Sequence, residues 1–350
     1  MKKALKKERE NLILKLIVEN YIKSGVPISS KLIAEKLNYK ISSATIRNIM
    51  AKLDEEGFLY QPHTSAGRIP TDLGLKFYIN KLLEEISSFK KEYNFVSKDF
   101  FEKEVDLDLL LEKTSKFLSD FSDSLGIVLY PRISRINFKR LKFIKLSENR
   151  IMLIMTTTSN FTITDTIYIR VNFTQNELDL ASEYLNKNFA GKNLIYVRDY
   201  FLKTLPKERA LLDKLIKKLI NFLKNYFNFE KNRDKVFLEG QANLLAKPEL
   251  FKMDELKMLF EDLEKKAKLI KLLTNFINAE GVRVIIGSEI DLPFFSGCTL
   301  IISNYRFKNQ SLGSLGILGP KRMPYKEVIN LVDYTAKSLT RAISKAHWEV

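Results

Sequence analysis

Several side chains between residues 42 and 56 carry hydrogen-bonding groups of the kind that read DNA. Apolar residues recur in this stretch at i, i+3, i+4 and i+7, which predicts a helix with one buried side. The other side offers hydroxyl, amide, guanidinium and ammonium groups, which can reach base edges or phosphates of duplex DNA. These outward polar residues are Ser43, Thr45, Arg47, Asn48 and Lys52.

The chemistry of each polar side chain suggests a role. We expect Arg47 to read guanine through O6 and N7, and Asn48 to read adenine through N6 and N7. Phosphate contacts are expected from Ser42, Ser43, Thr45 and Lys52, because such contacts position a protein without reading sequence. The alternative for Arg47 is an ordinary solvated helix residue.

A short polar segment follows this helix and predicts a β-ribbon wing. Residues 58–60 favour a short strand, and Arg68, Ile69 and Pro70 lead the chain back. The turn between them has a single charge and no apolar anchor, which suits phosphate or minor-groove contact. The candidate contacts are His63, Thr64, Ser65, Gly67 and Arg68. The alternative for His63 is an exposed loop histidine without a role.

Two further helices complete the predicted winged helix-turn-helix domain, residues 1–90. A helix from about Ala4 to Ser24 ends at Gly25, and Pro27 prevents its continuation. A short second helix is capped by Ser29 or Ser30, and a tight link leads to the polar helix, which Ser42 or Ser43 caps. Spacing alone also allows a plain helical subdomain, since short helix pairs are common.

The rest of the chain alternates between strand-rich and helix-rich stretches. After residues 86–106, which lack periodicity, a helix is expected from Leu107 to Ser124. Four β-branched and aromatic runs then predict one antiparallel meander: GIVLYPRI, LKFIKLS, RIMLIMTTT and FTITDTIYIR. Helices are expected at about 176–190, 207–228 and 250–280, and strands return before a last helix at about 324–345. This order predicts a multidomain α+β protein in which an α+β domain is interrupted by a mainly helical insertion.

Composition argues against several classes of function. A single cysteine, Cys298, excludes an internal disulfide framework, and only two histidines argue against a structural zinc site. Gly313, Gly316 and Gly319 are not followed by the Gly-Lys-Ser/Thr of a phosphate-binding loop. We therefore expect neither an enzyme nor a cofactor. A net charge of +16 suits a polyanionic partner, although the charge is spread along the chain.

The sequence also lacks signals for membrane insertion or export. It contains no run of about 18 uncharged apolar residues, so no membrane span is expected. Its N-terminal segment lacks the small-residue cleavage site of a signal peptide. We expect a cytoplasmic protein that does not interact with membranes.

Several blocks of the sequence, in order, resemble one family. SSATIRNIMAKLDEEGFLYQPHTSAGRIPTDLGLKFYIN closely resembles the start of the heat-inducible transcription repressor HrcA family, and GSLGILGPKRMPYKEVINLVDYTAKSL resembles its C-terminal signature. VFLEGQANLLAKPEL and VIIGSE with CTLIISNYRF resemble two intermediate blocks. The resemblance covers essentially the whole chain.

The resemblance implies an architecture, a partner set and a mode of regulation. It implies a winged-helix domain (1–90), a discontinuous GAF-like domain (104–175 and 276–350) and an inserted dimerising domain (176–275). It also implies a homodimer on an inverted-repeat operator, the CIRCE element of chaperone operons, and a GroEL-type chaperonin that maintains activity lost on heating. The alternative is a winged-helix regulator that senses a small effector through its GAF-like domain.

Overall fold

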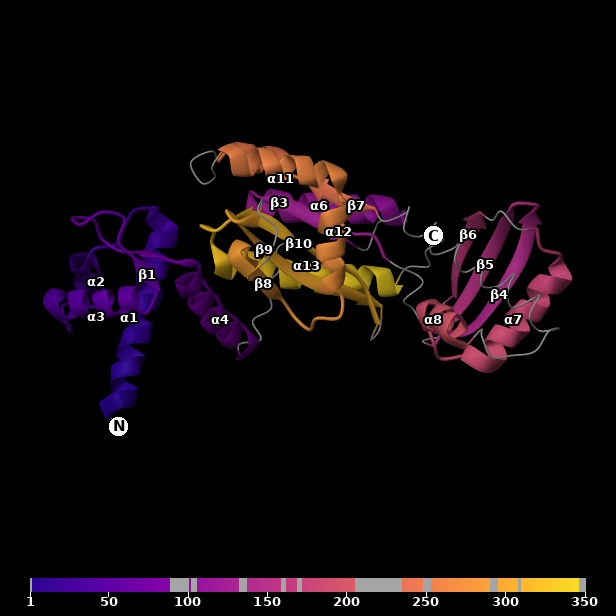
Figure 1. Cartoon of the computed structure of the whole chain (residues 1–350), viewed down its shortest axis with the longest axis horizontal. Helices are drawn as coiled ribbons and strands as arrows, with labels where there is room; N and C mark the ends of the chain where they lie inside the picture. Colours follow the sequence, from indigo (N-terminus) through magenta and orange to yellow (C-terminus); the bar gives the residue numbers. More distant parts are fainter. Residues whose placement is uncertain are drawn as a thin grey trace.

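The computed structural model describes most of the chain, in three groups of elements that follow one another (Figure 1). The described residues are 2–88, 101, 106–131, 137–158, 162–168, 172–204, 235–247, 253–289, 295–307 and 310–345. Among them, no helix combines the length and apolarity that crossing a membrane requires.

The first group is the predicted winged helix. Its elements are α1 (Lys2–Ser24), α2 (Ser30–Lys36), α3 (Ser43–Glu55), β1 (Leu59–Tyr60), β2 (Ile69–Pro70) and α4 (Asp72–Ser88). Gly25 (φ +72°) and Gly57 (φ +79°) follow α1 and α3 in the left-handed conformation, as their sequence positions predict. Ile17, Ile33 and Ile46 are fully buried between the helices. The predicted winged helix-turn-helix is therefore confirmed.

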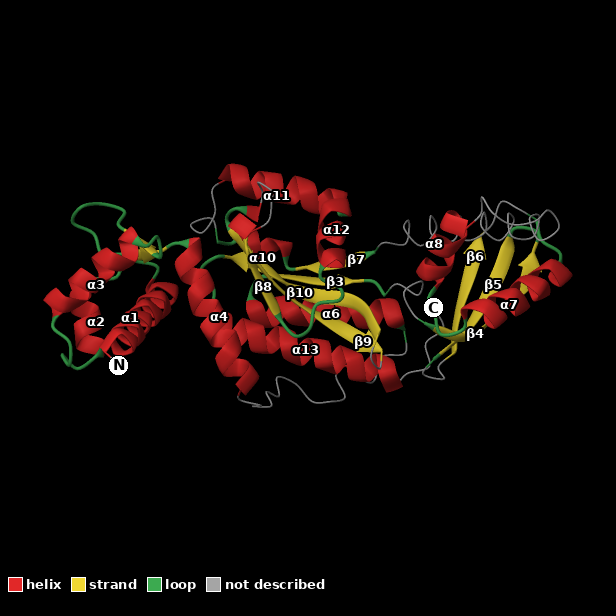
Figure 2. Cartoon of the chain, turned by 60° about the horizontal axis from the view of Figure 1, so that its bottom comes forward, coloured by secondary structure: helices red, strands yellow, loops and turns green. Residues whose placement is uncertain are grey.

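The second group is a five-stranded antiparallel sheet with helices on both faces (Figure 2). The strand order is β7 (Val236–Glu239), β3 (Leu125–Leu129), β10 (Gln310–Pro320), β9 (Cys298–Phe307) and β8 (Arg283–Ile286), and β8 leads into the short η4 (Gly287–Glu289). The helices are α6 (Leu107–Ser122), α10 (Gln241–Leu245), α11 (Met253–Lys265), α12 (Ala267–Asn275) and α13 (Tyr325–Lys345).

Two hydrophobic clusters cover the two faces of this central sheet. Val128 and Ile301 face α6 and α13 in one cluster, which is continuous with the core of the winged helix. Ile127 and Ile302 face α11 and α12 in the other. Neighbouring residues of one strand thus enter opposite cores, as the period of a strand requires. Cys298 is buried at the start of β9.

The third group is a separate three-stranded meander, and here the predicted single meander is wrong. Among the described strands, β4 (Phe138–Ser147), β5 (Arg150–Thr157) and β6 (Thr162–Tyr168) pair only with one another, whereas β3 pairs with β7 and β10. α7 (Gln175–Phe189) occupies the outer edge of β4: Asn186 and Ser182 accept hydrogen bonds from the N–H groups of Leu141 (2.8 Å) and Phe143 (3.1 Å). Because these side chains satisfy that edge, the meander ends at β4.

The sheets also divide the chain differently from the expected domain limits. β4–β6, expected within the interrupted domain (104–175), form the third group with α7 and α8 (Leu194–Thr204). β7 and α10–α12, expected in the insertion (176–275), pack with the central sheet. The helix predicted at 207–228 lies outside the described residues. An insertion that follows the sheets therefore includes residues 138–204.

Candidate nucleic-acid interface

The N-terminus of α3 is fixed by a side-chain cap. Ser42 has an extended backbone (φ −66°, ψ 149°), and its hydroxyl oxygen accepts a hydrogen bond from the N–H of Thr45 at 3.2 Å. The Ser42 and Thr45 hydroxyls also lie 2.9 Å apart. This cap satisfies a backbone donor of the first turn and sets the direction in which α3 leaves the turn.

The predicted polar side of α3 is exposed. Ile46, Met50 and Leu53 are at most 3% exposed and hold the helix against the core. The exposed polar side chains in the first two turns are Ser43, Thr45, Arg47 and Asn48. These four residues, which we expect to contact bases or phosphates, thus occupy one accessible surface, which we call the reading face.

Lys52 lies further along α3 and has intramolecular partners. Its Nζ is 2.7 Å from Oε2 of Glu10 in α1 and 3.4 Å from Oε1 of Glu56. Hydrogen bonding to Glu10 is the main cause that raises the pKa of Lys52 above its ordinary value. Because two carboxylates compensate its charge, the geometry favours a role for Lys52 in orienting α3 over the expected phosphate contact.

The wing is short and closed by side-chain hydrogen bonds. Leu59 pairs with Pro70, and Tyr60 with Ile69. Gln61 Nε2 donates to the carbonyl oxygens of Thr64 at 2.8 Å and Ala66 at 2.9 Å, which folds the turn back on itself. The candidate residues exposed at its tip are His63, Thr64 and Ser65.

Gly67 and Arg68 form the base of the wing. Arg68 exchanges backbone hydrogen bonds of 2.9 Å with Ile28, and its Nε lies 2.9 Å from Oδ2 of Asp54 at the end of α3. A Cβ on Gly67 would lie 2.3 Å from the carbonyl oxygen of Ile28. These two residues therefore join the wing to α3 and to the segment before α2, and they are less accessible than the tip.

Sequence reasoning overlooked two exposed residues near this surface and one contact that holds the winged helix. Tyr39 and Lys40 are exposed in the turn before α3, where Asn38 (φ +49°) and Tyr39 (φ +55°) adopt the left-handed conformation. Lys321 lies beyond β10 but touches the first turn of α4, where its Nζ is 2.7 Å from Oδ1 of Asp72. The basic Lys321-Arg322 pair beside the glycine-rich strand was the only sequence signal for this contact.

Family models match both parts of the chain. A model described as the HrcA protein C terminal domain matches residues 108–329, and one described as the Ribonuclease R winged-helix domain matches residues 12–77. The heat-inducible transcription repressor HrcA of Geobacter sulfurreducens is 37% identical over 336 residues, with 96% of this chain and 98% of that protein covered. The chain belongs to the HrcA family of heat-inducible transcription repressors.

Further similarities to this HrcA-family chain extend over its whole length. The HrcA of Thermodesulfovibrio yellowstonii is 31% identical, and the match covers 98% of this chain and 100% of that protein. A crystal structure at 2.2 Å resolution, described as a hypothetical protein, has a TM-score of 0.61 and 25% identity over 96% of this chain and 98% of that one. The relatives are named as transcription repressors, which agrees with the prediction of a non-enzymatic regulator.

Proposed function

We propose that this chain is a sequence-specific transcriptional repressor that acts in the cytoplasm on heat-shock operons. Its operator would be an inverted repeat of the CIRCE type upstream of chaperone genes. The observation that supports this best is the exposed reading face on the capped helix α3, which a wing follows, in a chain of the HrcA family. DNA recognition by a helix-turn-helix needs such an arrangement.

The side chains divide into readers, positioners and supports. Arg47 and Asn48 are assigned to base edges in the major groove. Phosphate contacts are assigned to Ser42, Ser43 and Thr45 on α3 and to His63, Thr64 and Ser65 on the wing. Lys52, Gly67 and Arg68 support this surface, because their side chains or backbone contact Glu10, Ile28 and Asp54.

A homodimer would present the reading face twice. A two-fold axis places two recognition helices in successive major grooves, so the operator repeats with inverted symmetry. We assign dimerisation to the inserted domain, which the family resemblance implies at residues 176–275 and which, drawn along the sheets, includes residues 138–204. The spacing between half-sites would then depend on how each winged helix is held relative to the dimer.

Heat would act on the folded state, without a ligand or a catalytic step. We propose that heating converts the repressor to a form that does not bind DNA, and that a GroEL-type chaperonin returns it to the active form. The division into several packed groups supports this idea, because multidomain proteins commonly unfold and misassemble by parts.

Footprinting on the promoter of the chaperone operon of the same genome tests the proposal. The full-length protein should protect both halves of an inverted repeat, with the protected positions one helical turn or a multiple of it apart. A duplex with the same base composition in scrambled order serves as the control. Equal affinity for the repeat and the scrambled duplex would refute the proposed function.

A further inference from the structure

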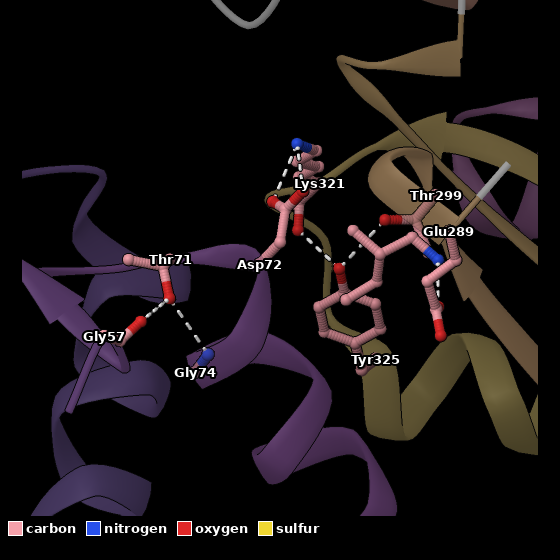
Figure 3. A network of polar contacts seen from close by, with 9 residues as sticks. Gly57, Thr71, Asp72, Gly74, Glu289, Thr299, Lys321 and Tyr325 are labelled. Atoms are coloured by element: carbon pink, nitrogen blue, oxygen red, sulfur yellow. Dashed lines mark hydrogen bonds and ion pairs between the residues drawn. The ribbon is translucent and has the colours of Figure 1, made fainter. Parts of the chain in front are cut away.

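The wing and the start of α4 form one rigid unit. The Thr71 hydroxyl donates to the carbonyl oxygen of Gly57 at 2.6 Å and accepts from the N–H of Gly74 at 3.2 Å (Figure 3). A Cβ on Gly74 would lie 2.2 Å from the carbonyl oxygen of Phe58, so α4 packs directly on the backbone at the base of the wing. The direction of α4 is thus tied to that of α3, because Gly57 lies two residues after the end of α3 at Glu55.

The same helix is held by the central domain through two ion pairs. Lys321 Nζ, beyond β10, lies 2.7 and 2.8 Å from the two carboxylate oxygens of Asp72 (Figure 3). Lys76, one turn further along α4, donates to Glu289 Oε2 at 2.8 Å and to the carbonyl oxygen of Val284 at 2.9 Å. Each of these charged side chains is 29–40% exposed, so the pairs are partly shielded from water.

The central partners are themselves fixed. The Tyr325 hydroxyl donates to the carbonyl oxygen of Lys321 at 2.6 Å and lies 3.1 Å from the Thr299 hydroxyl of β9. Burial raises the pKa of Tyr325 well above its ordinary value, so this hydroxyl stays protonated and can donate. Glu289 also accepts a hydrogen bond from the N–H of Ile286 at 2.9 Å. Lys321 and Glu289 are therefore fixed to the central sheet and move with it.

A further contact limits rotation about α4. The guanidinium of Arg322 lies against Gly25, where an added Cβ would be 2.7 Å from one of its nitrogens. Gly25 directly follows α1, so this contact lies at the end of a different helix from the one that carries the two ion pairs. The two ion pairs of α4 and the Arg322 contact after α1 hold the winged helix at three points. Contacts with α4 alone would leave it free to rotate about that helix.

We propose that Asp72, Lys76, Glu289 and Lys321 are positioning residues that set the half-site spacing the dimer accepts. This inference rests on the proposed function. Domains of one chain normally move relative to one another unless an interface holds them. These contacts remove that freedom, so the distance and the relative rotation of the two reading faces become properties of the whole dimer.

Three DNA duplexes separate this role from a merely structural one. The first carries the footprinted inverted repeat, the second the same repeat with its spacer lengthened by about five base pairs, half a helical turn, and the third a single half-site. Full-length wild type is compared with Lys321→Glu, Asp72→Lys, the double variant that restores opposite charges, and Lys76→Ala. Lys81→Ala is the matched control, because Lys81 pairs with Glu84 within α4.

Wild type should strongly prefer the native spacer. Each single junction variant should lose at least about fivefold of this preference, a usual size for coupling between sites, while its half-site affinity stays that of wild type. The double variant should be closer to wild type than either of its parents, and Lys81→Ala should match wild type. Unchanged half-site affinity also shows that the winged helix of each variant is folded.

Two results would overturn the inference in different ways. If wild type prefers the native spacer and all single junction variants keep that preference, the contacts do not set spacing, and the proposed function stands. If wild type does not distinguish the repeat from the scrambled duplex, the proposed function fails and the inference fails with it.

Discussion

At the scale of single residues, Arg47 should carry sequence information. It is exposed in the second turn of α3, next to Asn48. We expect Arg47→Ala to weaken operator binding by about 1–3 kcal/mol and to leave binding to random duplex nearly unchanged, because a base contact is made only at the right sequence. Titrations of both duplexes at one salt concentration measure this. An equal loss on random DNA would show that Arg47 contacts only phosphate.

Lys52 provides the opposite expectation, although it lies on the same helix. Its ammonium already pairs with Glu10, 42 residues earlier in the chain, and with Glu56. We expect Lys52→Met to leave the slope of log affinity against log salt concentration unchanged. A lost phosphate contact would instead reduce that slope by about 1. The Glu10 contact could not be predicted from the helical pattern, because it joins elements that only the tertiary fold brings together.

At the scale of elements, the base of the wing tolerates no added side chain. Gly67 faces the backbone of Ile28 too closely for a Cβ, and the next residue forms the bridge to that segment. We expect Gly67→Ala to destabilise the fold by about 1–3 kcal/mol, the usual cost of overpacking, and to weaken operator binding. Denaturant unfolding and titration measure the two effects. Ser65→Ala at the exposed tip is the control, which should unfold like wild type.

Tyr78 in helix α4 makes the free energy of unfolding of the winged helix depend on pH in the alkaline range. Burial, assisted by the charges of Glu19, Glu327 and Glu85, raises the pKa of Tyr78 from 10.0 to about 12. Between these values the unfolded chain releases a proton that the folded chain keeps, so the free energy of unfolding falls as pH rises from 10 to 12. The stability that the raised pKa of Tyr78 contributes is fully present below pH 10.

Tyr78→Phe should remove that part of the dependence. Its free energy of unfolding is expected to fall less steeply than that of wild type between pH 10 and 12. Denaturant unfolding at several pH values across this window, and at neutral pH as the reference, measures the difference. Identical slopes for the two proteins would contradict a raised pKa at Tyr78.

Elements with local signals were predictable, and those with distant partners were not. The Ser42 cap, the apolar stripe of α3 and the stops at Gly25 and Gly57 each depend on residues within a few positions. The division of strands between two sheets depends on pairing such as that of Ile127 with Gly316, far along the chain. All five residues of β3 are buried, whereas β5 alternates in burial. Both strands contain continuous apolar runs in the sequence, so the apolar pattern alone did not show this difference.

At the scale of the whole molecule, the sequence predicted which residues form the candidate surface but not how the rest of the chain holds that surface in place. The reading face and the wing tip follow from one continuous stretch, residues 42–70. How that stretch is held depends on Lys321 and Glu289, more than 200 residues later. Long-range ion pairs leave no periodic pattern in a sequence, so the junction that we propose to set the operator spacing emerged only from the structure.

The same organisation supports the proposed inactivation by heat. One hydrophobic cluster runs from the winged helix through one face of the central sheet to the three-stranded sheet. Loss of the junction or of one sheet would expose part of this cluster, and exposed apolar surface in a large protein favours misassembly over correct refolding. Recovery after heating should then depend on a chaperonin, which isolates such forms from one another.

A heating experiment on the full-length protein tests this dependence. After brief heating and cooling, the fraction that binds the footprinted repeat should fall and stay low. A GroEL-type chaperonin with its co-chaperonin and ATP should restore it, and the same mixture without ATP should not. Unheated protein kept for the same time measures losses from storage. Full operator binding after heating and cooling without chaperonin would mean that the folded state returns unaided, so heat regulation would have to act elsewhere.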